Sequence, residues 1–255
     1  MQLDTLISGA PGPLPPVVLA HGLFGSARNL GGIARRLEGR RVLRVDMRNP
    51  GDSPWSERHD YPAMAGDLAA VIAAEGGVAD LVGHSMGGKA AMVLALQQPQ
   101  AVRRLVVLDI APLAYEHDQL GPIEAMEAVD LAQVTRRGEA DRQLARGIED
   151  EGVRAFLLQS LDLKAEPPAW KMNLAVLRRE MAAVSGWPEG LRPGAFTGPV
   201  LALKGARSGY VDATGEAALS RWFPQAELRE IAGAGHWLHA EQPEAVGDAV
   251  AAFLG

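Results

Sequence analysis

The residues with the clearest potential for chemistry are those at positions 83–87, which read Gly-His-Ser-Met-Gly and place Ser85 in a Gly-x-Ser-x-Gly frame. An apolar run precedes this frame, and residues 89–98 after it are rich in strong helix formers. Such a tight turn from strand to helix strains the backbone at the serine, and only small neighbours such as Gly83 and Gly87 fit around it. The hydroxyl then stands exposed at the end of the strand, so the pattern predicts nucleophilic catalysis.

A serine hydroxyl is a poor nucleophile at neutral pH, so it needs a base within hydrogen-bond reach. His236 lies in the glycine-rich segment 232–237, after an expected strand and before the last expected helix. Gly233 and Gly235 give this segment the freedom to bring the imidazole over the end of the strand. His239 is the alternative, but it lies nearer the start of that helix. The sequence therefore favours His236 as the general base.

Two carboxylates are candidates for the acid that orients the histidine. Asp109 ends the apolar run 105–108, where a charge is unfavourable unless a partner such as an imidazole offsets it. Asp212 follows the apolar run 200–203, in the region where such an acid is commonest, but Ser208 stands where the carboxylate is expected. We expect Asp109 to be the acid, with Asp212 as the alternative and Ser208 as an assisting hydrogen-bond partner.

Donors for the oxyanion of a tetrahedral intermediate are expected in residues 21–25, which read His-Gly-Leu-Phe-Gly and follow a central strand. Two backbone N–H groups aimed at this oxygen suffice to stabilise it, and we expect those of Leu23 and Met86. Residues 46–53 form a turn expected at the same rim. The chain has no Walker loop, no dinucleotide fingerprint and no histidine or carboxylate spacing typical of a metal site. We therefore expect no cofactor and no metal.

These residues need a scaffold that brings strand ends together at one edge. Short β-branched runs alternate with longer amphipathic segments, which is typical of an α/β fold with a mostly parallel sheet flanked by helices on both faces. The expected strands are 17–20, 42–45, 78–82, 105–108, 200–203 and 227–231, with a further edge strand at 3–7. The expected helices are 27–38, 62–75, 87–98, 213–222 and 243–253.

The alternation stops between about residues 112 and 194, where Ala, Glu, Arg, Leu and Met dominate and no strand pattern stands out. A segment of this length is too long to be a loop in a compact domain. We interpret residues 112–194 as a helical cap inserted into one α/β core, which comprises residues 1–111 and 195–255.

Composition narrows the choice of partners and compartment. The 255 residues carry a net charge of −6, which argues against nucleic acid and against an anionic membrane, since both attract clustered Lys and Arg. The absence of cysteine excludes disulfides and thiolate metal sites. Residues 1–16 lack the basic and apolar regions of a signal peptide, and no apolar stretch reaches about 18 residues. We therefore expect a cytoplasmic protein.

Six motifs occur together along nearly the whole chain, and their combination resembles the esterase subgroup of the α/β-hydrolase superfamily that includes bacterial YbfF. The resemblance implies an α/β-hydrolase fold with a cap over the site, and hydrolysis of small acyl esters or thioesters. It also implies an acid at Asp109 and places Ser208 near the histidine. Pro50 departs from the family pattern, which carries histidine there, so no rim role is carried over to it. The motifs lie at residues 21–26, 46–49, 61–65, 83–89, 108–112 and 233–237.

The function favoured by these residues is that of a serine carboxylesterase acting on a small-molecule acyl ester or thioester. Ser85 attacks the acyl carbonyl, His236 transfers the proton to the leaving group, and water then cleaves the acyl-enzyme. The alternative on the same fold is a carbon–carbon bond hydrolase or a lyase. A non-catalytic small-molecule receptor is a third possibility, and a complete Ser, His and Asp set argues against it.

Overall fold

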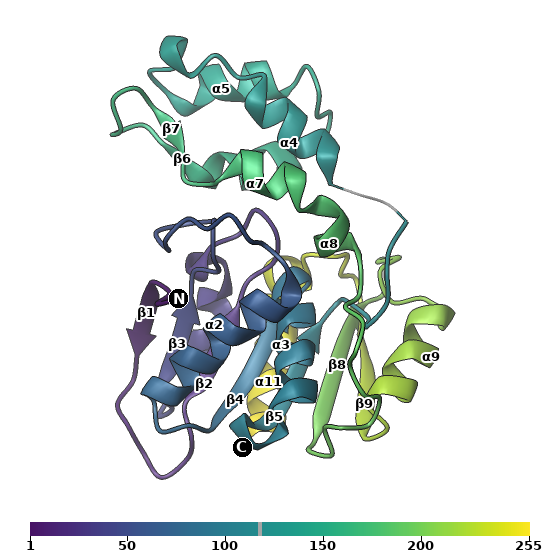
Figure 1. Ribbon diagram of the computed structural model, residues 1–255. Helices are drawn as coiled ribbons and strands as arrows, with labels where there is room; N and C mark the ends of the chain where they lie inside the picture. Colours follow the sequence, from purple (N-terminus) through teal and green to yellow (C-terminus); the bar gives the residue numbers. More distant parts are fainter. Residues whose placement is uncertain (117–118) are drawn as a thin grey trace.

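The central sheet has seven strands among the residues that the computed structural model describes, which are 1–116 and 119–255 (Figure 1). The strand order is β1-β3-β2-β4-β5-β8-β9, and all neighbours are parallel except β1, which pairs antiparallel with β3. The predicted α/β fold with a mostly parallel sheet is confirmed. The strands are β1 (Thr5–Ser8), β2 (Val17–Ala20), β3 (Val42–Val45), β4 (Ala79–His84), β5 (Val102–Leu108), β8 (Val200–Gly205) and β9 (Ala226–Ile231).

Helices cover both faces of this sheet. In Figure 1, α2 and α3 lie in front of the sheet and α11 lies behind it. The helices of the core are α1 (Gly31–Arg36), α2 (Tyr61–Ala74), α3 (Met86–Gln97), α9 (Ala213–Trp222), α10 (Leu238–Glu241) and α11 (Pro243–Leu254), and the 3-10 turns are η1 (Ala27–Leu30) and η2 (Pro99–Ala101).

Strand β2 shows why an inner strand can be apolar along its whole length. Side chains alternate between the two faces of a strand, and here both faces are covered. Val17 and Leu19 belong to the buried cluster that contains residues of α1 and α11, whereas Val18 and Ala20 belong to the cluster formed with α2 and α3. The strand therefore reads as a continuous apolar run, which is what made it recognisable in the sequence.

Strand β5 begins three residues before its predicted start at residue 105. Its first residues include Arg103 and Arg104, whose charges interrupt the apolar pattern. The guanidinium of Arg103 donates to the buried carboxylate of Asp80 in β4, with Nε to Oδ1 at 2.7 Å. Because an ion pair across the strands replaces apolar contacts there, the sequence pattern concealed this part of the sheet.

The segment between β5 and β8 consists largely of short helices, which lie beyond one end of the sheet in Figure 1. It also holds a small antiparallel pair of strands that the sequence did not reveal, because each strand has only two residues. Residues 117 and 118 of the predicted cap lie outside the described residues. The elements are α4 (Leu120–Glu127), η3 (Leu131–Gln133), α5 (Arg137–Leu144), α6 (Glu151–Leu157), η4 (Leu158–Ser160), β6 (Leu161–Asp162), β7 (Ala169–Trp170), α7 (Leu174–Arg179) and α8 (Met181–Ser185).

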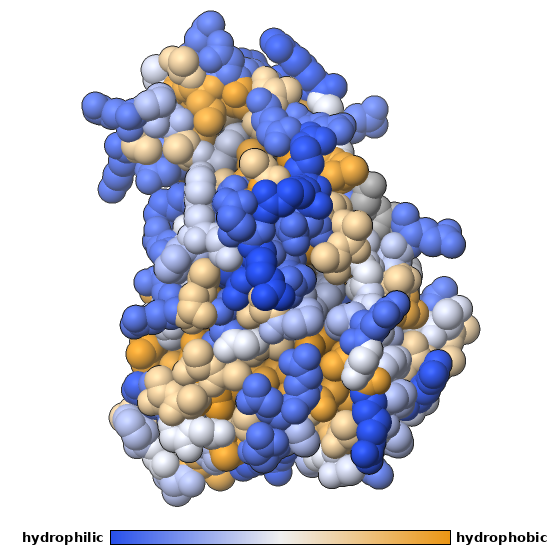
Figure 2. Space-filling model, in the orientation of Figure 1, coloured by the Kyte–Doolittle hydropathy of each residue, from blue (hydrophilic) through white to orange (hydrophobic). Residues whose placement is uncertain are grey.

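The inserted segment touches the core through the turn after β3. Pro50 forms an isolated β-bridge with Met172, and the Gly51 N–H donates to the Lys171 carbonyl oxygen at 2.9 Å. Figure 2 shows hydrophilic side chains gathered across the middle of the visible face, at the level where the insertion meets the core. Among the described helices, none combines the length and the apolar character needed to cross a membrane.

Candidate active site

Ser85 occupies the turn between β4 and α3 with a backbone conformation of φ 51° and ψ −118°. A positive φ is uncommon for a residue with a side chain and stores strain at the turn. A Cβ atom at Gly83 would lie 2.3 Å from the carbonyl oxygen of Gly87, and one at Gly87 would lie 2.4 Å from that of Ala20. The turn therefore requires glycine at both positions, as the motif predicted.

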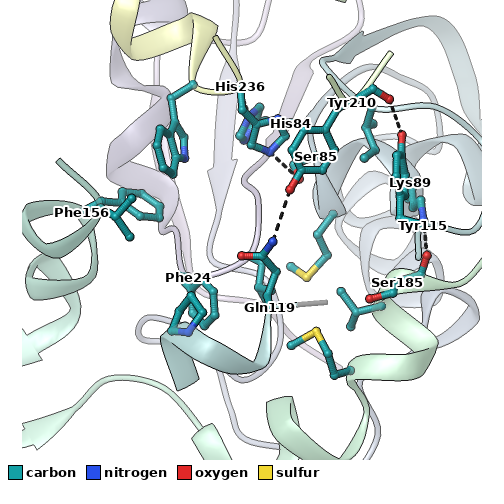
Figure 3. Close-up of a pocket in the computed structure, with 18 of the residues that line it drawn as sticks. Phe24, His84, Ser85, Lys89, Tyr115, Gln119, Phe156, Ser185, Tyr210 and His236 are labelled. Carbon is teal, nitrogen blue, oxygen red and sulfur yellow. Dashed lines mark hydrogen bonds between the residues drawn. The ribbon is translucent and has the colours of Figure 1, made fainter. Parts of the chain in front are cut away.

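His236 lies in the loop between β9 and α10, and its imidazole reaches Ser85 (Figure 3). Its Nε2 atom lies 3.1 Å from the Ser85 Oγ atom, and its Nδ1 atom lies 2.8 Å from Oδ2 of Asp109. The Asp109 carboxylate accepts a hydrogen bond from the N–H at Nδ1, so Nε2 is the free acceptor for the serine hydroxyl. The ring of His84 supports this loop through a hydrogen bond from its Nε2 atom to the His236 carbonyl oxygen at 2.9 Å.

Asp109 follows β5 and is completely buried, with φ at 52°. Its Oδ1 atom accepts a hydrogen bond from the Gly205 N–H at 2.9 Å, and its Oδ2 atom accepts from the Ser208 hydroxyl as well as from His236. A buried carboxylate is tolerated only where such donors replace water. The structure thus places Ser208 beside the Asp109 carboxylate.

Asp212 and His239, the two alternatives from the sequence, lie elsewhere. The Asp212 carboxylate accepts from the Gly215 N–H at 2.9 Å and caps the start of α9. His239 packs against His84, with ring centroids 4.4 Å apart, and burial followed by the nearby His236 lowers its pKa to about 4. The structure brings Asp109 and His236 to the serine, and it gives Asp212 and His239 other contacts.

The loop expected to hold the oxyanion approaches Ser85 closely. A Cβ atom at Gly22 would lie 2.8 Å from Nδ1 of His84 and 3.1 Å from the Ser85 Cβ atom. Met86 is the first residue of α3, where backbone N–H groups have no partner within the helix. Leu23 and Met86 line the same cavity as Ser85. The positions of both residues are thus compatible with the predicted oxyanion hole.

The His21 side chain holds the loop at residues 21–25 in place through two hydrogen bonds. The Met47 N–H donates to the His21 Nε2 atom at 2.9 Å, so the proton of the ring is on Nδ1, which donates to the Gly22 carbonyl oxygen at 2.8 Å. Burial lowers the pKa of His21, so the imidazole is neutral and this pair of hydrogen bonds persists at neutral pH.

A cavity of about 320 Å³ opens above the serine and is lined mainly by apolar side chains. Phe156 and Leu157 of the insertion line it, whereas Leu158, Trp170 and Met172 are buried in the hydrophobic core. The Phe156 ring packs against Trp237, which also lines the cavity, with centroids 5.7 Å apart. Such a cavity suits a small substrate with an apolar part.

Lys89 lies one helical turn after Ser85 and lines the same cavity. Its ammonium group donates to the carbonyl oxygens of Ser185 at 3.1 Å and Gly186 at 2.7 Å, at the end of α8. Burial lowers the pKa of Lys89 to about 7. The local sequence does not fix the orientation of this lysine, because only the tertiary fold brings the end of α8 to α3.

The carboxylates of Asp4, Asp46 and Asp52 form the one cluster among the described residues that has the spacing of a metal site. Asp46 is already engaged, since it accepts from the N–H groups of Ala27 at 2.7 Å and Asp52 at 2.8 Å. The Asp52 carboxylate pairs with Lys171 at 2.6 Å. These hydrogen bonds and this ion pair give the Asp46 and Asp52 carboxylates a role in holding the loops together.

A serine at the turn after a central parallel strand, with a histidine and an aspartate at the ends of later strands, defines the α/β-hydrolase class of proteins. Residues 15–243 match the family described as alpha/beta hydrolase fold, and the chain belongs to this family.

Relatives within this family are similar over most of their length. The chain is 41% identical to the sn-1-specific diacylglycerol lipase ABHD11 of Mus musculus over 251 residues, which are 94% of this chain and 81% of that protein. It is 40% identical to Esterase YbfF of Escherichia coli (strain K12) over 244 residues, or 94% of this chain and 92% of that one. A solved structure called Marine microorganism esterase is 33% identical with a TM-score of 0.93, and 99% of each chain is covered. The resemblance predicted from the motifs is confirmed.

Proposed function

We propose that the protein is a serine carboxylesterase that cleaves small acyl esters or acyl thioesters through an acyl-enzyme intermediate. The observation that supports this proposal most strongly is the continuous chain of hydrogen bonds from Ser85 through His236 to Asp109. That the protein is a serine hydrolase acting on esters follows from its family and from relatives that are named esterase and lipase.

In the first half of the reaction, the Ser85 oxygen attacks the acyl carbonyl carbon while its proton passes to Nε2 of His236. The carbonyl oxygen becomes an oxyanion, which the backbone N–H groups of Leu23 and Met86 stabilise. Asp109 holds the imidazole in the correct tautomer and offsets the positive charge that it gains. The imidazolium then protonates the alcohol or thiol as the carbon–oxygen or carbon–sulfur bond breaks, which leaves Ser85 acylated.

In the second half, water attacks the acyl-enzyme and gives its proton to the same nitrogen of His236. The second tetrahedral intermediate collapses with return of that proton to the Ser85 oxygen, which releases the carboxylic acid and restores the enzyme. Ser208 assists as a further donor to the Asp109 carboxylate, beside Gly205 and His236, which keeps that carboxylate in place.

The inserted segment serves as a cap in this proposal, with residues 112–194 as the cap and residues 1–111 and 195–255 as the core. Phe156 from the insertion and Leu23 from the core line one cavity, so both parts contribute to substrate binding. The apolar lining of the cavity favours acyl chains of modest size. We place this reaction in the cytoplasm, as expected from the sequence of residues 1–16.

The test is the hydrolysis of short p-nitrophenyl esters and matched acyl thioesters by the protein and by Ser85→Ala. We expect Ser85→Ala to remain folded and to lose nearly all hydrolysis, and a fluorophosphonate to label Ser85 in the unmodified protein. Ser220→Ala, a matched change at an exposed serine of α9, should keep full turnover and labelling. Labelling at a serine other than Ser85, or hydrolysis that survives Ser85→Ala, would refute the proposal.

A further inference from the structure

The aromatic ring of Tyr210 lies flat against the imidazole of His236. The ring centroids are 3.8 Å apart and the planes are inclined by only 18°. Figure 3 shows Tyr210 beside His236, and both residues line the cavity. The two edges of the imidazole are bound to Ser85 and Asp109, so the tyrosine covers a face of the ring that neither partner reaches.

The backbone of Tyr210 is held on both sides of its side chain. Its N–H donates to the Ser208 hydroxyl oxygen at 3.2 Å, and its carbonyl oxygen accepts from the Tyr115 hydroxyl at 2.7 Å. The Tyr115 hydroxyl in turn accepts from the Ala111 N–H at 2.9 Å, two residues after Asp109. These bonds connect the tyrosine to both sides of the Asp109 position, so the stacked ring is fixed relative to the imidazole.

The surroundings of the imidazole determine what this stacking does. Asp109 is the negative group in contact with it. His84 lies with its ring centroid at 4.9 Å, and burial keeps its pKa well below the usual value, while the pKa of His239 is lowered to about 4. Both neighbours are therefore neutral near pH 7. Burial and the charge of Asp109 raise the pKa of Tyr210, so its phenol is also neutral.

A neutral aromatic ring presents negative potential at its face, and this potential attracts a cation placed over it. In the proposed reaction the imidazole becomes a cation each time it takes the serine or water proton. The stacked tyrosine ring then stabilises the imidazolium of His236 more than mobile water molecules in the same place would. It also blocks rotation of the imidazole away from the line between Ser85 and Asp109.

We propose that Tyr210 is a positioning residue of the esterase reaction, whose ring holds the His236 imidazole in place and stabilises its protonated form. This inference rests on the proposed function, because it assigns to Tyr210 a role that acts through His236. The Tyr210 hydroxyl is a separate feature, since it accepts a hydrogen bond from Gln119 Nε2 at 3.4 Å. Removal of the ring and removal of the hydroxyl therefore have different expected effects.

The experiment compares Tyr210→Leu, which removes the ring, with Tyr210→Phe, which keeps it. For Tyr210→Leu we expect kcat to fall about tenfold, as for loss of one desolvated cation–π contact. The pH of half-maximal kcat/KM on the acid side should move down by about half to one unit, because the protonated imidazole is less stabilised. Tyr210→Phe should keep kcat within about threefold and leave this pH unchanged. The rate of fluorophosphonate labelling, measured over the same pH range, should follow the same pattern.

The matched control is Trp237→Leu, which removes an aromatic side chain from the same cavity at a centroid distance of 6.2 Å from His236. It should change KM and leave the half-maximal pH as it is. Tyr210→Met, which keeps a large apolar side chain, replaces Tyr210→Leu in the comparison if thermal unfolding shows that the leucine variant is not folded.

Three results would overturn the inference: an unchanged pH profile in the folded ring-deletion variant, an equal loss in Tyr210→Phe, or a loss confined to KM. An unchanged pH profile would mean that the Tyr210 ring does not stabilise the protonated imidazole. An equal loss in Tyr210→Phe would assign the effect to the hydroxyl, and a loss confined to KM would indicate that Tyr210 contacts only the substrate. Failure of the proposed function would be recognised separately, because unmodified protein would then not hydrolyse esters or Ser85→Ala would remain active.

Discussion

The replacement of Asp109 by asparagine tests the arrangement of the site most directly. Asparagine has nearly the same shape and tolerates the positive φ of 52° at this position, so the fold should persist. The Gly205 N–H requires an acceptor at the position of Oδ1, so the amide oxygen must lie there. The amide NH2 group then faces the Nδ1 atom of His236. It can only donate to that nitrogen, which forces the ring proton onto Nε2, opposite the Ser85 hydroxyl.

The wrong tautomer of His236 determines how much turnover Asp109→Asn is expected to lose. A hydrogen bond to a charged group contributes about 1.5 to 3 kcal/mol, which would reduce turnover by roughly 10- to 150-fold. The variant also loses the general base, because Nε2 now carries a proton and cannot accept another from Ser85. We therefore expect kcat to fall by about 10⁴, equivalent to about 5.4 kcal/mol.

The assay is the hydrolysis of a short p-nitrophenyl ester together with thermal unfolding. Asp212→Asn is the matched control, because an asparagine side chain can accept from the Gly215 N–H as the aspartate does. We expect it to keep turnover within about twofold and to change the unfolding free energy by less than about 1 kcal/mol. If Asp109→Asn retained turnover within tenfold of the wild type while Asp212→Asn abolished it, the acid would be Asp212 and the reasoning would be wrong.

Three further predictions concern the base, a buried amine and the turn at the nucleophile. His236→Ala should lose nearly all ester hydrolysis while His239→Ala keeps most of it, and the reverse order in kcat/KM would reassign the base. Because burial lowers the pKa of Lys89 in the fold to about 7 from an ordinary value of 10.5, the unfolded chain binds more protons between these values. The buried Lys89 amine therefore has its full destabilising effect below pH 7. Above pH 7 the free energy of unfolding should rise by up to about 1.4 kcal/mol per pH unit, until pH 10.5 is reached. Lys89→Met should lack this rise in urea unfolding at pH 7 and pH 10, and equal slopes would contradict the burial argument. Gly83→Ala should lower the unfolding free energy by about 3 kcal/mol, whereas Gly66→Ala, where a Cβ meets nothing within 4 Å, should not lower it.

Much of the fold was predictable because its signals are local. The predicted strands at β2 and β3 matched the observed strands residue for residue, since both faces of these inner strands are covered and their side chains are apolar except for Arg44. The charged start of β5 and the two-residue strands β6 and β7 carried no such signal. The Arg103 and Asp80 pair stabilises its strands through a contact between residues 23 positions apart, which a local pattern does not record.

The sequence by itself determined that Ser85 lies at a strained turn, because the steric need for glycine on either side is written in five consecutive residues. It also determined the class of the fold and the ester chemistry expected of it. The tertiary structure decided which partners reach the serine. Asp109 and His236 are 127 residues apart and meet because β5 and β9 end at the same edge of a parallel sheet. The stacking of Tyr210 on His236 likewise depends on how two loops converge, and the spacing of residues along the chain carries no information about that convergence.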